Sequence, residues 1–156
     1  MYVWLLAVLQ WLHILGGIFW FGSVLTADFI ILPTLRSLST ETQEAFFRAL
    51  LRRGPKIVGW VALGTITLGL IRGIAGGALG ELLSLYGVTW IAAFVVGSGL
   101  YLLGARVVTP AARRLLELSQ GPNHETGMAR LRRLTLTELA GFMLILGLMI
   151  AMRFGY

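Results

Sequence analysis

One histidine lies deep inside the long apolar stretch that opens the chain. His13 is the only residue between Met1 and Ala27 with an acidic or basic side chain. In a helix it would lie about 18 Å from Met1, at ~1.5 Å per residue. An imidazole near the middle of a bilayer needs a partner, because burying an unpaired polar group costs roughly 1–3 kcal/mol. Two interpretations are open: His13 binds a metal or a haem iron, or it hydrogen-bonds a neighbouring helix.

The residues around His13 indicate what it could bind. A spacing of three and four residues places one set on a single stripe of the helix: Gln10, His13, Gly17, Trp20, Val24 and Asp28. Gly16 and Gly17 leave room beside the imidazole, either for a flat cofactor or for another helix. Trp11 and Trp20 could form an apolar wall, and Gln10 or a backbone carbonyl could bond the second ring nitrogen.

Three more charged residues interrupt apolar stretches. Arg72 lies near the outer end of the second stretch, where it either snorkels to the lipid headgroups or clamps an anion such as a haem propionate. Asp28 and Glu138 fall near the cytoplasmic edge of the first and fourth stretches. We expect one of them to pair with Arg106 or Arg133, and a path for a proton or cation is the alternative.

Other metal ligands are sparse. Met143, Met149 and Met152 lie in the fourth apolar stretch, and thioethers suit Cu(I), although methionine is also common core filler. His124 falls in a polar connection and is expected to be solvated, too far away to join His13. The absence of cysteine excludes thiol catalysis, disulfides and iron–sulfur ligation. No nucleotide-binding, hydrolase or zinc motif occurs, which argues against hydrolysis and phosphoryl transfer.

The elements that must position these residues are membrane helices. The composition is 57% hydrophobic and 13% charged, against about 25% charged in soluble domains. Runs of roughly 20 apolar residues span a bilayer as helix. The sequence therefore predicts an all-α integral membrane four-helix bundle that forms a single transmembrane domain over residues 1–156, with spans at about 2–33, 56–78, 82–108 and 134–153.

Basic residues are distributed unevenly between the connections. Of the 13 Lys and Arg residues, five lie in the first connection or at its edge, counting Lys56 at the start of the second span, and six lie in the third connection or at its edge, counting Arg106 near the end of the third span. The positive-inside bias makes those connections cytoplasmic and puts both termini outside. The same bias accounts for the net charge of +6 without nucleic acid as a partner. We expect a multi-pass protein of the inner (cytoplasmic) membrane.

The basic connections are predicted to contain short amphipathic helices. Thr40 and Gln43 match a capping box ahead of a helix over 45–53, which Gly54-Pro55 would end. Residues 111–119 form a second candidate helix, and Asn123 could cap a helix that runs into the fourth span.

The two halves of the chain also share a faint pattern. Each has a span, a proline (Pro33 or Pro110) and then arginines around a similar apolar motif. Two related helical hairpins or chance similarity would both explain it.

Small residues recur at four-residue spacing. Gly69, Gly73 and Gly77 form two such steps, and Ala93/Gly97 and Gly147/Ala151 repeat them. These faces let helices approach closely, either within the bundle or between protomers of an oligomer.

One stretch resembles a known group of proteins. The sequence Trp11-Leu-His13-Ile-Leu-Gly16-Gly17-Ile-Phe-Trp20-Phe-Gly22, ending in Leu32-Pro33, is similar to the first helix of the copper-resistance D family and of the related bacterial membrane protoporphyrinogen oxidase. Phe47-Arg-Ala-Leu-Leu-Arg-Arg and Gly69-Leu-Ile-Arg72-Gly73 also resemble that pattern, so the likeness covers roughly the first half.

The resemblance implies a b-type haem bound by His13. Those relatives use further histidines or a lysine in later spans, and this chain has none there, so two histidine ligands from one protomer are not expected. The second ligand would be a methionine, a water, a substrate or a group from another protomer. The expected cofactor site comprises His13 as iron ligand with Gln10, Gly16, Gly17, Trp20 and Arg72 around it.

Three function classes remain open at this point. The first is a b-type haem protein in membrane electron transfer or porphyrin oxidation, an oxidoreductase if it is an enzyme. The second is a copper-handling permease or subunit that uses His13 and methionines. The third is a scaffold or assembly subunit without chemistry. The expected partners are the lipid bilayer, further copies of the chain and a redox partner protein.

Overall fold

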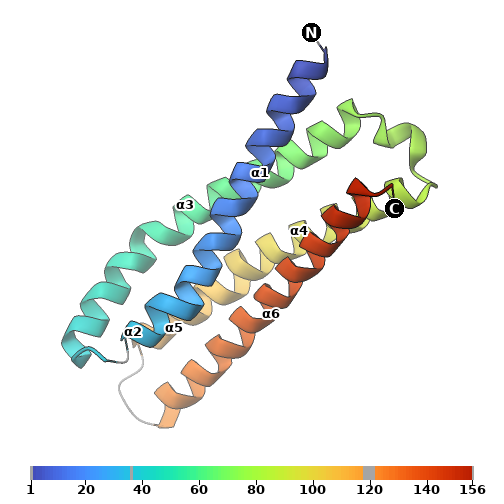
Figure 1. Cartoon of the computed structure of the whole chain (residues 1–156). Coiled ribbons are helices and arrows are strands. Elements are labelled where there is room, and N and C mark those ends of the chain that lie inside the picture. The colour runs from blue at the N-terminus through green and yellow to red at the C-terminus, as the bar shows by residue number, and fades with distance from the viewer. Residues whose placement is uncertain (1, 36, 118–121, 156) are drawn as a thin grey trace.

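Four long helical rods make up the protein (Figure 1). The computed structural model describes residues 2–35, 37–117 and 122–155, and every regular element in those ranges is helical. Four helices there are long and apolar enough to cross a membrane: Val3–Leu35, Thr40–Ala75, Leu85–Glu117 and His124–Arg153. The predicted all-α membrane four-helix bundle is confirmed.

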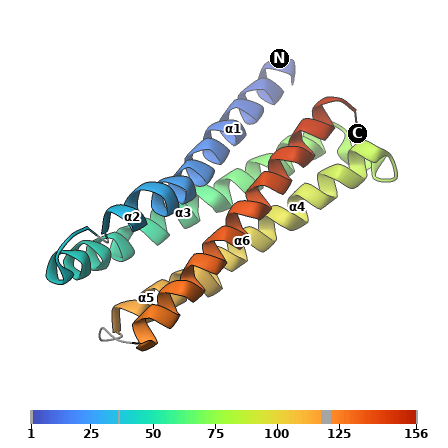
Figure 2. The ribbon, with the colours of Figure 1, turned by 60° about the horizontal axis from the view of Figure 1, so that its bottom comes forward.

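The two halves of the chain repeat one order of elements. The first half runs through α1 (Tyr2–Thr26), the π-helical η1 (Ala27–Ile31), α2 (Leu32–Leu35) and α3 (Thr40–Ala75). The second half runs through α4 (Leu85–Leu103), the π-helical η3 (Gly104–Val108), α5 (Thr109–Glu117) and α6 (Pro122–Arg153). The helix α1 packs along α3, and α4 packs along α6 (Figures 1 and 2). This shared order fits the two related hairpins better than chance similarity does.

The bundle has two distinct ends. At the basic end lie α2, α5 and the starts of α3 and α6, and at the far end lie both termini and the α3–α4 link (Figure 1). At 36 residues, α3 is about 54 Å long at ~1.5 Å per residue. Because this exceeds the ~30 Å of a hydrocarbon core, the bundle extends beyond the apolar layer.

A π-helical turn precedes each of the two matching prolines. The Leu32 N–H bonds the Ala27 carbonyl, and the Thr109 N–H bonds the Gly104 carbonyl, five residues back in each case. Pro33 and Pro110 follow immediately and carry no N–H to donate. The wider turn keeps each helix continuous through its proline, so the first rod runs to Leu35 and Pro110 begins no separate helix.

Two predictions about the start of α3 are wrong, one on where the helix ends and one on which residue caps it. Pro55 lies inside α3, so the helix expected over 45–53 is the first part of one long helix. Packing on both sides of the proline, at Phe47 and at Val58, holds the helix together. The N-cap of α3 is Ser39 and not Thr40, and Gln43 donates its side-chain amide to the Leu38 carbonyl.

The other two helix starts can be compared only in part. Residues 109–117 are helical as expected, but residues 118 and 119 lie outside the described ranges. The helix α6 begins at Pro122 and runs without interruption to Arg153, as expected of a helix entering the fourth span. The proposed cap by the Asn123 side chain lies outside the described side chains.

The α3–α4 link at the far end is a glycine turn. The helix α3 ends at Ala75, three residues earlier than predicted, and Gly77 has a φ of 91°, which favours glycine. A short 3-10 helix, η2 (Ala78–Glu81), follows. Ser84 then caps α4 by accepting the Gly87 N–H, so the third rod begins at Leu85 and not near residue 82.

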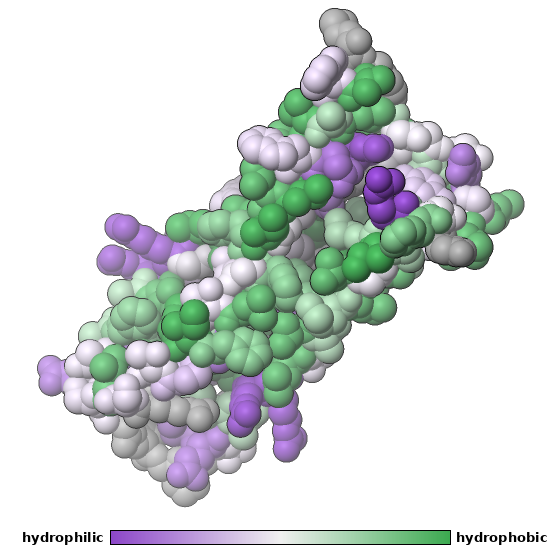
Figure 3. All heavy atoms as spheres, in the orientation of Figure 1, coloured by the Kyte–Doolittle hydropathy of each residue, from purple (hydrophilic) through white to green (hydrophobic). Residues whose placement is uncertain are grey.

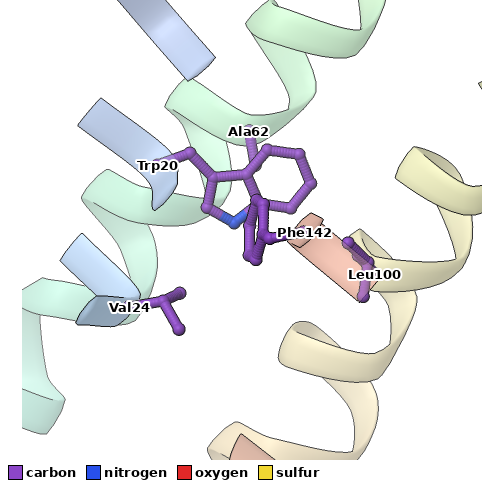
Figure 4. Packing of buried hydrophobic residues seen from close by; sticks show 5 residues of the cluster. All are labelled: Trp20, Val24, Ala62, Leu100 and Phe142. Atoms are coloured by element: carbon purple, nitrogen blue, oxygen red, sulfur yellow. The ribbon is translucent and has the colours of Figure 1, made fainter. Parts of the chain in front are cut away.

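All four rods meet at one apolar cluster. Trp20 of α1 lies between Ala62 of α3 and Phe142 of α6, with Leu100 of α4 beside them (Figure 4). The rings of Trp20 and Phe142 meet edge to face, with centroids 5.0 Å apart.

A second apolar cluster includes Ala112, Leu115 and Leu131, and many apolar side chains along the rods face outward. Trp4 and Trp60 are 77% and 74% exposed, and hydrophobic residues cover most of the visible face along the rods (Figure 3). A surface of this kind fits contact with lipid.

Candidate functional site

His13 is held between α1 and α3. Its Nδ1 atom lies 2.8 Å from the Thr65 carbonyl oxygen. A carbonyl only accepts hydrogen bonds, so Nδ1 carries the proton and Nε2 of the neutral ring keeps a lone pair. The interpretation that His13 hydrogen-bonds a neighbouring helix is therefore confirmed, with a carbonyl and not Gln10 as the partner, and binding of a metal or haem iron stays a prediction.

Gly69 provides the surface on which the imidazole lies. A Cβ at Gly69 would come within 2.7 Å of Cε1 and 3.0 Å of Nδ1 of His13. Any larger residue there would push the ring away from the Thr65 carbonyl. Gly69, which the sequence did not assign to the His13 site, thus belongs to it, and Thr65 could have been found because it lies one turn earlier on the same face.

The two glycines beside His13 have different surroundings. The side chain of Thr65 occupies the place of a Cβ at Gly16, so this glycine lets α1 approach α3 and does not leave space for a cofactor. Nothing lies within 4 Å of a Cβ at Gly17. The sequence left room at these glycines either for another helix or for a flat cofactor. A neighbouring helix fills the space at Gly16, and the space at Gly17 is open.

Neither tryptophan encloses His13. Trp20 is 5% exposed and belongs to the apolar cluster with Phe142, and Trp11 is 60% exposed on the outside of α1. The apolar wall of Trp11 and Trp20 beside a cofactor at His13 stays a prediction. The two cavities described below are not lined by His13 either.

Gln10 and Arg72 lie about one turn further toward the far end, on α1 and α3 respectively. Both are half-buried. The Arg72 side chain runs forward along its own helix toward Gly76, beyond the end of α3, and its Nε is buried without a hydrogen-bond partner in the described part of the chain. Hydrophilic residues are visible there between the upper part of α1 and the end of α6 (Figure 3).

The remaining ligand candidates are not brought to His13. His124 is in the first turn of α6 at the basic end and is half-buried, and its Nδ1 has no partner among the residues that the structure describes, so it is not the solvated loop residue that was expected. It lines a small cavity of about 70 Å³ with residues such as Phe47 and Met128.

The methionines of α6 are also separate from His13. Met149 and Met152 lie on the part of α6 that diverges from α1 (Figures 1 and 2). Among residues 2–35, 37–117 and 122–155, no group of three His, Cys, Asp or Glu side chains could hold a metal ion.

Asp28 and Glu138 converge at a second location, nearer the basic end. Both line a cavity of about 620 Å³ between the rods. The Asp28 carboxylate oxygens are buried with no hydrogen-bond partner among the described residues, and Glu138 is 6% exposed. Arg106 and Arg133 point outward and are exposed, so the expected ion pair with either of them is wrong.

No family model, curated protein or solved structure that we compared with the chain matches it. The function must therefore be argued from the residues and their geometry.

Proposed function

We propose that this protein binds a b-type haem through His13 and takes part in membrane electron transfer or porphyrin redox chemistry. The observation that carries the proposal is the 2.8 Å hydrogen bond from Nδ1 to the Thr65 carbonyl. Histidine ligands commonly donate their other ring N–H to a carbonyl, which fixes the tautomer and makes the free nitrogen more basic. A neutral imidazole held in this way is a suitable axial ligand for haem iron.

Two further features support a porphyrin at this position. Gly17, four residues from His13, has open space at its missing side chain. Arg72 has a buried and unpartnered Nε one turn from Gly69, and a guanidinium suits a propionate carboxylate. Haem would supply one-electron chemistry, while the protein would supply the ligand, the anion contact and the apolar surroundings.

The absorption spectrum of the detergent-purified protein tests this proposal. We expect a Soret band when the protein is produced with ample haem, and a spectrum typical of five-coordinate iron or of iron with a non-histidine second ligand. A protein that stays colourless under those conditions contradicts the proposal. Bound copper in metal analysis would then favour copper handling, and no metal would favour a scaffold.

We further infer that the protein lies in the inner membrane with both termini outside. The inference rests on the basic residues, ten of which are described and all exposed, around the basic end: Arg48, Arg52, Arg53, Lys56, Arg106, Arg113, Arg114, Arg130, Arg132 and Arg133. Reporter fusions at Tyr156 are expected to read as extracytoplasmic. A cytoplasmic reading at Tyr156 would reverse the orientation.

A homo-oligomer and a redox partner protein complete the proposal. Nothing lies within 4 Å of a Cβ at Gly147, so the small-residue face that it forms with Ala151 on α6 is open to another protomer. A second protomer would also provide a route to a second iron ligand.

A further inference from the structure

A cavity of the bundle lies between Trp20 and the basic end. Its volume of about 620 Å³ falls within the range of about 300–1,000 Å³ that is usual for small-molecule sites. Residues from α1, α3, α4, α5 and α6 line it, and most of them are apolar, including Val58, Leu100 and Val108. Phe47 and Tyr101 add aromatic rings. An apolar cavity of this size suits a compact hydrophobic molecule.

Both charged groups of this cavity are carboxylates, and the other polar side chains of its described lining are the hydroxyls of Ser23, Thr26, Tyr101, Thr109 and Thr135. Among the described residues no hydrogen bond within 3.5 Å reaches the buried carboxylate oxygens of Asp28, and Glu138 places Oε1 3.1 Å from the position of a Cβ at Gly104. The Thr135 hydroxyl donates to the Arg132 carbonyl and also lies close enough to Asp28 to interact with its carboxylate. Glu138 and Asp28 are close enough to repel each other when both are ionised.

The described lining of the cavity contains no cation. Of residues 2–35, 37–117 and 122–155, no Lys or Arg lines it, although the surrounding end of the bundle is rich in arginine. A buried carboxylate without a counter-charge is costly, and two that face each other are more so. An anionic ligand would increase this cost and a neutral one would leave it, whereas a cation would offset it.

The backbone around the carboxylates is also specialised. Asp28 belongs to η1, and Gly104, against which the Glu138 carboxylate lies, begins η3. Single π-helical turns inside α-helices occur frequently at functional sites. Here both of them border the same cavity, one from each half of the chain.

We propose that this cavity binds a lipophilic organic cation, an apolar molecule with a protonated amine. The amine donates to Asp28 and Glu138, and the apolar body packs against the rings and aliphatic side chains of the wall. This site is separate from His13 and does not depend on bound haem.

A charge series on one apolar framework tests the proposal. The probes are 1-adamantylamine, 1-adamantanol and adamantane-1-carboxylate, titrated by calorimetry into the full-length protein in detergent, with protein-free detergent as blank. We expect saturable binding of the amine, at least about tenfold weaker binding of the alcohol, and none of the carboxylate. Equal binding of amine and alcohol, or heat that does not exceed that of the blank, overturns the proposal.

Variants locate the site. Glu138→Gln and Asp28→Asn are each expected to weaken amine binding by about tenfold or more. The exposed glutamates Glu41 and Glu117 lie near the same end, and Glu41→Gln and Glu117→Gln are expected to bind the amine like the wild type. If one of the two cavity variants does not fold, the other is used to test the site. Wild-type affinity for the amine in a folded cavity variant overturns the proposed cavity site.

Discussion

The His13→Ala variant is expected to lose the Soret band of the wild-type protein while the four-helix bundle remains folded. The substitution removes the only imidazole placed between α1 and α3 in the described structure. Losing the hydrogen bond to the Thr65 carbonyl costs only about 1 kcal/mol net, and the central cluster of Trp20 and Phe142 is not touched. Visible absorption and far-ultraviolet circular dichroism on the same sample separate loss of haem from loss of fold.

Two controls sharpen this prediction. His124→Ala removes the other histidine, at the basic end, and should keep the band. In His13→Gly, free imidazole added to the buffer should restore the band, because the ligand rather than the side-chain tether is what the iron needs. An unchanged Soret band in His13→Ala would rule out His13 as the essential ligand and with it the proposed function.

The Gly73→Ala variant is expected to destabilise the bundle by about 1–3 kcal/mol, the usual cost of overpacking a tight contact. The indole ring of Trp90 on α4 occupies the place of a Cβ at Gly73. A rigid ring cannot give way as the end of a flexible chain can, so α3 and α4 must move apart. Gly73→Leu should have a larger effect, measured as the midpoint of denaturation in mixed micelles.

Gly64→Ala on the same helix is the matched control. Nothing lies within 4 Å of a Cβ at Gly64, so alanine there should be neutral or stabilise α3 by up to about 1 kcal/mol through its helix propensity. The two substitutions are therefore expected to differ in sign. Equal denaturation midpoints for the two variants would mean that Gly73 does not contact Trp90.

The four spans could be predicted from the sequence because membrane helices depend on local composition. A run of about 20 apolar residues satisfies its own backbone in lipid, whatever lies next to it. The far-end boundaries shifted by three residues at Ala75 and at Leu85, because Gly76, Gly77 and Ser84 end and begin helices through backbone geometry rather than hydropathy.

The prolines show where local signals are insufficient. Gly54-Pro55 has the pattern of a helix end, yet α3 continues through it because side chains pack against neighbouring helices on both sides. At Pro33 and Pro110 the chain adopts a wider turn that needs no N–H from the proline. Each outcome depends on the energy of tertiary packing, and a short stretch of sequence read alone does not contain that energy.

Helical periodicity alone places His13 within an apolar span, on a stripe with Gln10 and Gly17, because it sets which side chains share a face. Its partner, the Thr65 carbonyl, and the contacts at Gly16 and Gly69 depend on how α1 packs against α3. The packing of the helices also makes Asp28 and Glu138 line the same cavity, which Arg106 and Arg133 do not line. Hydropathy adds up along one segment, whereas the rotation and crossing of helices depend on side chains that meet from segments distant in the chain.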